Sequence, residues 1–191
     1  ANTSRRFSDA TTKSESSVPF VSNDVDYGTN IFTTPTDGIA MSEDGETIYY
    51  CALQGLTLYS VPAKALADFT LSNDDISAQV VNHGPKAAPS DGLVIHGHTL
   101  YYGGLTTNTL YAWDTRLGTL TEDNQQVGAA DAATLQWIDS FALSGDVLYL
   151  TTNRLQLYIT RSVYKEQDAN YRLFKLSLAP ATALIIYPSR Q

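Results

Sequence analysis

The chain has 191 residues, of which 43% are hydrophobic and 17% charged, and 12 Lys and Arg stand against 20 Asp and Glu. This composition is typical of a globular protein, and the formal charge of −8 offers no basic surface to the phosphates of a nucleic acid. No apolar run approaches the roughly 20 residues that a membrane-spanning helix needs. We therefore expect neither a nucleic acid nor a membrane as a partner.

A single cysteine, Cys51, excludes a disulfide within the chain and a cysteine-rich zinc site. The run around Cys51 is apolar and strand-like, which favours a buried side chain, and a bridge to a partner chain is the alternative. Asn2-Thr3-Ser4 has the pattern of an N-glycosylation acceptor, which suits a secreted protein. No charged segment followed by an apolar one opens the chain, so a signal peptide has been removed or is not encoded in it.

The first 30 residues are polar and contain two short strand-like runs, Arg5–Phe7 and Pro19–Val21. We expect these runs to complete a sheet that begins upstream of the chain. Helical patterns are scarce, and one short helix is predicted at Ala63–Phe69, directly after Pro62. The other apolar runs alternate with turn residues and are typical of strands, so the predicted fold class is all-β.

The predicted strands form an internal repeat with three copies. Each copy has an aspartate that opens an apolar run, a short turn, and a second strand rich in tyrosine, which together predict a hairpin. The opening aspartates are Asp37, Asp91 and Asp139, so the copies begin 54 and 48 residues apart. Third strands are predicted at residues 56–61, 109–113 and 171–176. A fourth strand is evident only in the first copy, at residues 78–82.

The repeat length lies in the range of about 40 to 50 residues that is typical of four-stranded propeller blades. The sequence therefore predicts a β-propeller of which this chain supplies about three blades, at approximately residues 1–84, 85–136 and 137–191. Propellers hide their blade edges in rings of typically four to eight blades, so three blades do not close a ring. We expect the remaining blades to come from an N-terminal fragment, a second chain or a second copy of this chain.

Motifs in all three copies carry a likeness to a known family. They are Thr36–Ser42, Asp44–Tyr50 and Leu58–Pro62, then Lys86 with Ser90–Leu93, and finally Trp137–Phe141 and Thr152–Gln156. In this order they resemble the yellow/major royal jelly protein family, over roughly residues 5 to 178. The resemblance implies the C-terminal half of a six-bladed propeller. It also implies a secreted protein that converts dopachrome, captures biogenic amines, or has a nutritive or structural role.

Asp37, Asp91 and Asp139 occupy equivalent positions in the repeat and are expected to converge near the propeller axis. Convergent carboxylates can neutralise an ammonium group, coordinate a hard cation, or act as a general base when burial raises a pKa. The alternative for each residue is ordinary turn chemistry, in which the carboxylate of an Asp accepts backbone N–H bonds.

The resemblance adds three residues to the candidate ligand site: Ser140, Asn153 and Leu155. Family members commonly have Thr at the position of Ser140, and some have an aromatic residue at that of Leu155. An Asn can donate and accept hydrogen bonds at once, which suits a catechol or an indole amine, while the alternative for Asn153 is a strand-end cap. Trp137 and Phe141 are the aromatic residues expected to approach a bound ring.

The sequence gives little support to a metal site, a hydrolase active site or a phosphate-binding loop. His96-Gly97-His98 invites a metal interpretation, but its place in the repeat predicts a hairpin turn. His83 has no acid or thiol pattern beside it, and the sequence contains neither a Gly-x-Ser-x-Gly elbow nor a glycine-rich phosphate loop. The sequence predicts no cofactor and no metal ion.

Three functions remain open. The first is a yellow-like propeller that holds a small aromatic amine or catechol in its axial cavity, with or without isomerising dopachrome. The second is a metal-dependent hydrolase of the gluconolactonase and senescence-marker type, whose Asp-Gly motifs look similar to Asp37-Gly38 and Asp91-Gly92, although matching Asn ligands are missing from the repeated positions. The third is a non-catalytic extracellular structural protein.

Overall fold

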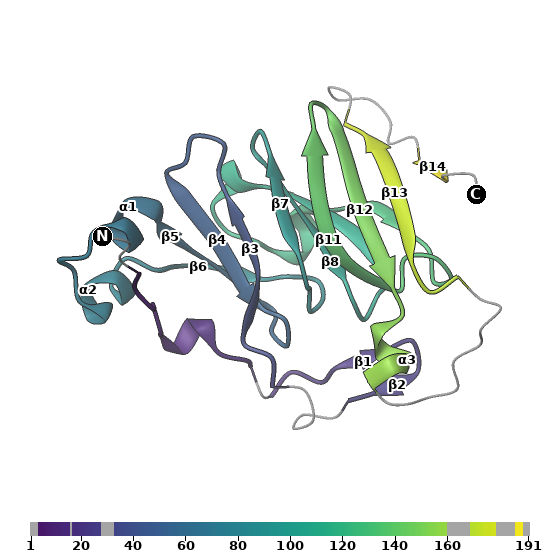
Figure 1. Cartoon of the computed structure of the whole chain (residues 1–191), viewed down its shortest axis with the longest axis horizontal. Helices are drawn as coiled ribbons and strands as arrows, with labels where there is room; N and C mark the ends of the chain where they lie inside the picture. The colour runs from purple at the N-terminus through teal and green to yellow at the C-terminus, as the bar shows by residue number, and fades with distance from the viewer. Residues whose placement is uncertain (1–3, 16, 28–32, 160–168, 179–185, 189–191) are drawn as a thin grey trace.

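The computed structural model describes residues 4–15, 17–27, 33–159, 169–178 and 186–188. Within them, the chain forms three four-stranded antiparallel sheets and one two-stranded sheet (Figure 1). Asn2 and Thr3 of the predicted glycosylation acceptor lie outside the described residues. In the described part of the chain, no helix is long and apolar enough to cross a membrane.

Each large sheet follows the repeat, and every strand pairs with the next one in the sequence. The first sheet contains β3 (Thr36–Met41), β4 (Thr47–Ala52), β5 (Thr57–Pro62) and β6 (Val81–Pro85). The second contains β7 (Leu93–His96), β8 (Thr99–Gly104), β9 (Thr109–Asp114) and β10 (Gln125–Ala130). The third contains β11 (Trp137–Ser144), β12 (Val147–Asn153), β13 (Arg172–Ser177) and β14 (Ile186–Pro188). The all-β prediction is therefore confirmed.

Two fourth strands differ from the sequence prediction. In the first sheet, the predicted strand at residues 78–82 is found three residues later, as β6. In the second sheet, β10 was not predicted at all. A bulge between Val127 and Ala129 interrupts its alternation, and Gly128 lies at that bulge, so its sequence lacks a regular strand pattern.

The first strands of the three sheets, β3, β7 and β11, lie next to one another. Gly38 and Gly92 make this close approach possible, because a Cβ at either position would overlap the backbone carbonyl oxygen of Asp91 or Asp139, respectively. The Gly92 N–H also donates to the Asp139 carbonyl at 3.0 Å. Asp37-Gly38 lies inside β3, so the turn alternative is wrong for Asp37. The repeated Asp-Gly pair serves the contact between sheets.

The hairpin turns lie at the other end of these strands (Figure 1). The β7–β8 turn has Gly97 at φ 59°, a left-handed conformation that glycine adopts without strain. Gly45 and Gly145 have the same conformation in the two other hairpins. The predicted hairpin turn at His96-Gly97-His98 is therefore confirmed.

Apolar cores fill the spaces between neighbouring sheets. The core between the first and second sheets contains Cys51, Leu58, Leu100, Tyr102 and Trp113, all buried. Its Cys51 is a free thiol with no exposed surface, which confirms the predicted buried side chain and opposes a bridge to another chain. The core between the second and third sheets contains the buried side chains of Leu110, Leu135, Ile138, Leu148, Leu150 and Leu176.

The described N-terminal residues add no strand to the three large sheets, and their role in completing a sheet that begins upstream stays a prediction. Residues 5–7 are not a strand, and the Arg5 guanidinium donates to the carbonyls of Asp68 and Leu71 instead. β1 (Val21–Ser22) pairs with β2 (Val25–Asp26) in a small hairpin of its own. This hairpin lies at the end of the large sheets opposite the hairpin turns, near α3 (Figure 1).

The described helices are all short. α1 (Ala63–Ala67) begins directly after Pro62, as predicted, and α2 (Asn73–Ser77) and α3 (Leu155–Ile159) were not predicted. Single 3-10 turns occur at Ala10–Thr12, Thr115–Leu117 and Glu122–Asn124. α3 begins two residues after the end of β12, so the strand alternation does not continue through Arg154 and Leu155.

Candidate functional site

The three repeat aspartates meet at one end of the inner strands. Asp37 lies in β3, Asp91 stands two residues before β7, and Asp139 lies in β11. Because these strands are neighbours, the three carboxyl groups come within electrostatic reach of one another, and each of the other two charges acts on Asp91. One carboxyl group from each sheet therefore contributes to a single acidic cluster.

Asp91 is the most perturbed member of the cluster. Burial raises the pKa of Asp91 to about 7, and the charges of Asp37 and Asp139 and a hydrogen bond to the Asp139 side chain act in the same direction. The Trp137 indole N–H donates to Asp91 Oδ2 at 2.9 Å and opposes this rise. Two carboxyl groups hydrogen-bond to each other only when one carries a proton. The carboxyl group of Asp91 therefore takes up and releases a proton near neutral pH.

Asp37 and Asp139 complete the acidic surroundings. Burial and the Asp139 charge raise the pKa of Asp37. The exposed Ser140 hydroxyl donates to Asp139 Oδ2 at 2.9 Å, so Ser140 orients the carboxylate that faces Asp91. Like charges that are partly removed from water favour either a proton or a cationic ligand. The three carboxyl groups therefore favour a positive charge beside them, and Arg172 lines the pocket next to Asp139.

Asn153 and Leu155 lie beside the cluster, on the third sheet and α3. Asn153 Oδ1 accepts the Leu155 N–H at 2.8 Å, which is the strand-end cap that the sequence allowed as an alternative. A pocket of about 440 Å³ is lined in part by Asp139 and Asn153. A neighbouring pocket of about 180 Å³ is lined by Asn153 and Leu155. Asp139, Asn153 and Leu155 are thus brought to two adjoining pockets.

The sequence missed one residue that lines both pockets, Tyr171, and two that line the smaller one, Arg154 and Tyr158. Tyr171 is 80% exposed, which is unusual for a large aromatic side chain and leaves its ring open to a ligand. Its position at the start of a predicted strand gave no signal of such a role, because tyrosines are frequent throughout the repeat.

Trp137 does not have the predicted role. Its side chain has no exposed surface, and it packs edge-on against Phe20 with ring centroids 5.8 Å apart. A fully buried indole cannot stack on a ligand, so that interpretation is wrong for Trp137. Phe141 is half-buried and faces Gly92 of the second sheet.

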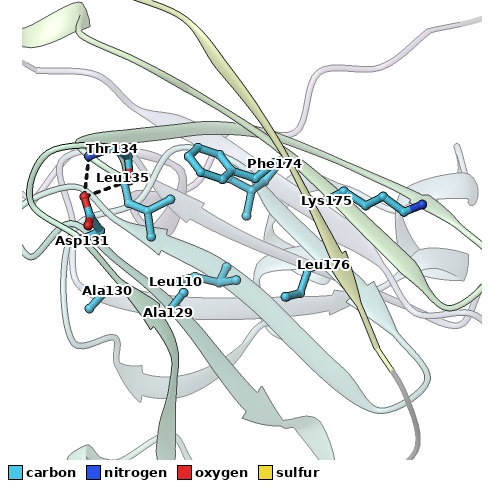
Figure 2. Close-up of a pocket in the computed structure, with 10 residues that line it drawn as sticks. Leu110, Ala129, Ala130, Asp131, Thr134, Leu135, Phe174, Lys175 and Leu176 are labelled. Atoms are coloured by element: carbon cyan, nitrogen blue, oxygen red, sulfur yellow. Dashed lines mark hydrogen bonds between the residues drawn. The ribbon is translucent and has the colours of Figure 1, made fainter. Parts of the chain in front are cut away.

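A separate apolar pocket of about 260 Å³ lies between the second and third sheets (Figure 2). Its walls include Leu110, Leu135 and Phe174, and Asp131 stands at one end. The Asp131 carboxylate already accepts the N–H groups of Ala133 and Thr134 and the Thr134 hydroxyl, at 2.7 to 2.9 Å. Such a pocket has few uncommitted polar groups to orient a ligand. The aspartate end is therefore the stronger candidate site.

Among the described residues, no group of three His, Cys, Asp or Glu side chains is arranged to hold a metal ion. At the turn end, His96 Nδ1 lies 3.4 Å from Glu43 and Nε2 lies 3.2 Å from Asp146. Because the two ring nitrogens point to carboxylates of different sheets, His96 bridges the hairpin turns.

The fold is that of a β-propeller, as comparison with solved structures shows. The chain is similar to a luciferin-regenerating enzyme (15% identity, TM-score 0.52, covering 80% of this chain and 49% of that one). It is also similar to a gluconolactonase from Xanthomonas campestris (15% identity, TM-score 0.51, covering 79% of this chain and 46% of that one). A chain of the nidogen/laminin complex is a third example (9% identity, TM-score 0.51, covering 80% of this chain and 48% of that one). Our chain thus spans about half the length of each, and at these identities the likeness shows the fold alone.

The family model described as Major royal jelly protein matches residues 2–183, so the chain belongs to this family. The resemblance noted in the sequence is thereby confirmed. No curated protein sequence matches the chain.

Proposed function

We propose that the chain is about half of a secreted, six-bladed propeller that binds a small aromatic amine or catechol at its aspartate end. The observation that carries this proposal is the convergence of Asp37, Asp91 and Asp139 from equivalent positions of three sheets. Carboxylates that are partly removed from water attract an ammonium group, which can replace the proton that burial favours on Asp91.

The neighbouring polar and aromatic groups suit the rest of such a ligand. Asn153 and Ser140 provide an amide and a hydroxyl beside Asp139, and Tyr171 offers an exposed ring to an aromatic one. In the catalytic form of the proposal, dopachrome isomerisation, a group must take a proton from one carbon of the substrate and return it elsewhere. Asp91 meets this need because its pKa of about 7 suits proton transfer at neutral pH.

Open faces at both ends of the row of sheets support a larger ring with blades at approximately 1–84, 85–136 and 137–191. Strand alternation puts Ile39 and Met41 on the face of β3 opposite Gly38, and they are 60% and 58% exposed. On the third sheet, Leu173 is 52% exposed on the face opposite Leu176. In the proposed ring, the remaining blades cover these faces. They come from an N-terminal fragment, a second chain or a second copy, and the intact masses of the assembled protein distinguish the three.

Tyramine binding to the assembled protein tests the site, with 4-ethylphenol as the uncharged analogue of the same ring. We expect tyramine to bind at least tenfold more tightly, and Asp91→Asn to weaken tyramine binding about tenfold. Asp123→Asn, which removes an exposed carboxylate elsewhere, is the matched control and should leave the affinity unchanged. Equal binding of the two phenols, or an unaffected Asp91→Asn variant, would contradict the proposal. Stoichiometric Ca²⁺ in the purified protein would instead favour a metal-dependent hydrolase, and the absence of any ligand a structural role.

A further inference from the structure

We propose that Trp137 is a positioning residue for Asp91: its indole N–H holds the carboxyl group toward Asp139, and the β1–β2 hairpin holds the indole in turn. The inference rests on the proposed function, in which Asp91 is the group that exchanges a proton. Trp137 then acts on the site through Asp91, because its own buried side chain cannot contact a ligand.

Trp137 makes a direct hydrogen bond to Asp91. The distance from Trp137 Nε1 to Asp91 Oδ2 is 2.9 Å, and the donor belongs to a side chain with no exposed surface. An indole carries a single N–H donor, and bulk water does not compete for it in this position. A bond to an ionised acceptor is stronger than one to a neutral acceptor, so Trp137 favours the carboxylate form of Asp91.

The packing around Trp137 prevents its indole from turning away from Asp91. Its ring lies in a buried cluster with Phe20, Tyr27, Leu53 and Leu105, all with less than one-tenth of their surface exposed. Phe20 contacts both other rings, with centroids 5.8 Å from Trp137 and 5.1 Å from Tyr27. Two members, Phe20 and Tyr27, flank the β1–β2 hairpin.

The hairpin is itself tied to the second sheet. Ser22 Oγ donates to the Leu105 carbonyl at 2.9 Å. The side-chain amides of Asn23 and Asn108 exchange two hydrogen bonds, at 3.0 and 2.9 Å. These contacts join segments more than 80 residues apart in the sequence. A continuous series of contacts therefore runs from the hairpin through Phe20 and Trp137 to Asp91.

The charges around Asp91 show why one fixed donor matters. Asp91 faces two carboxyl groups, Asp37 on β3 and Asp139 on β11. On the Trp137 side, Tyr27 is the titratable side chain among the described residues of the cluster, and burial raises its pKa, so it stays neutral. Among the described residues, the Trp137 N–H is thus the group that opposes the rise in the pKa of Asp91.

The chain contains a matched pair of tryptophans for the test. Trp137→Phe keeps an aromatic ring and removes the N–H donor. Trp113→Phe makes the same change in a side chain that is equally buried, and whose indole nitrogen has no hydrogen-bond partner in the described structure. The readout is the titration of the Asp91 carboxyl carbon by NMR in ligand-free, assembled protein, with the resonance assigned through Asp91→Asn.

We expect Trp137→Phe to move the midpoint of Asp91 upward by about one pH unit and Trp113→Phe to leave it unchanged. Phe20→Leu keeps the donor but loosens its packing, and it should move the midpoint in the same direction by less. It also serves as the second variant should Trp137→Phe fail to fold. An Asp91 midpoint that is the same in the wild type, Trp137→Phe and Phe20→Leu overturns the inference.

Tyramine binding as a function of pH separates this inference from the proposed function. If Trp137→Phe shifts the carboxyl titration but the wild type binds no tyramine, the positioning role stands and the proposed ligand class fails. If tyramine binds with the same pH profile in the wild type and in Trp137→Phe, and the carboxyl midpoint is unchanged, the ligand class stands and the positioning role fails.

Discussion

The first two strands of each large sheet form a hairpin, and both ends of these hairpins bring together side chains from three sheets. The side chains at the two ends differ in charge and burial. At the turn end, Glu43, His96 and Asp146 come from three different sheets and form ion pairs in side chains that are 57%, 29% and 74% exposed. At the other end, Asp37, Asp91 and Asp139 also come from three sheets, but all are carboxyl groups, and Asp91 is largely buried. Convergence alone therefore does not make a site. Burial and like charge distinguish the aspartate end.

Substitution of Gly92 at the aspartate end should lower the free energy of unfolding far more than substitution of Gly97 at the turn end. This is the largest difference that we expect between the two ends. Gly92→Ala places a methyl group against the Asp139 carbonyl oxygen and should cost about 2–4 kcal/mol of unfolding free energy. Gly97→Ala meets no atom within 4 Å and bears only the strain of its φ of 59°, about 1 kcal/mol. Urea unfolding of both variants measures the difference. Equal losses would show that the close approach of the inner strands does not require a glycine.

The pH dependence of stability is the next largest effect. Because the pKa of Asp91 is about 7 in the folded chain and near 3.8 when exposed, the folded state binds more protons between these values. Stability should therefore fall as pH rises from about 4 to 7, by roughly 2–4 kcal/mol for this one group. The free energy of unfolding of Asp91→Asn should vary less with pH over this range, and this variant should be more stable than the wild type at pH 8. Parallel stability curves from thermal unfolding would contradict the buried carboxyl pair.

Removing the bridge at the turn end should have the smallest effect. His96→Gln loses contacts with Glu43 and Asp146, but exposed ion pairs contribute little, so we expect a loss of at most about 0.5 kcal/mol at pH 6. The measurement is again thermal unfolding, with His98→Gln as the control from the same turn. A loss as large as that of Gly92→Ala would mean that the turn end, too, holds the sheets together.

Local patterns predicted most of the fold. The alternation around Tyr49-Tyr50 and Tyr101-Tyr102, together with turn residues such as Gly45 and Gly97, was enough to predict the hairpins and their repeat. β10 was missed because its bulge breaks the alternation on which such predictions depend. α3 was missed because the Asn153 side chain ends the strand by accepting a backbone N–H, a choice between cap and strand that the sequence left open.

The candidate site was predicted in part. Equivalent positions in the repeat were sufficient to indicate that Asp37, Asp91 and Asp139 come together, because every copy folds in the same way. The roles of the aromatic residues were not predictable on this basis. Trp137 was expected near a ligand, but its side chain donates a hydrogen bond to Asp91 and packs against Phe20.

By itself, the sequence determined the all-β class, the repeat, the family and the meeting of one aspartate from each sheet, since all of these follow from patterns within single repeats. Only the tertiary structure decided that the glycine after Asp37 and Asp91 serves the contact between sheets, and that burial beside Asp37 and Asp139 raises the pKa of Asp91. It also decided that the Trp137 indole N–H donates to Asp91. The physical reason is that burial and hydrogen bonding depend on neighbours from distant segments, which no local pattern specifies.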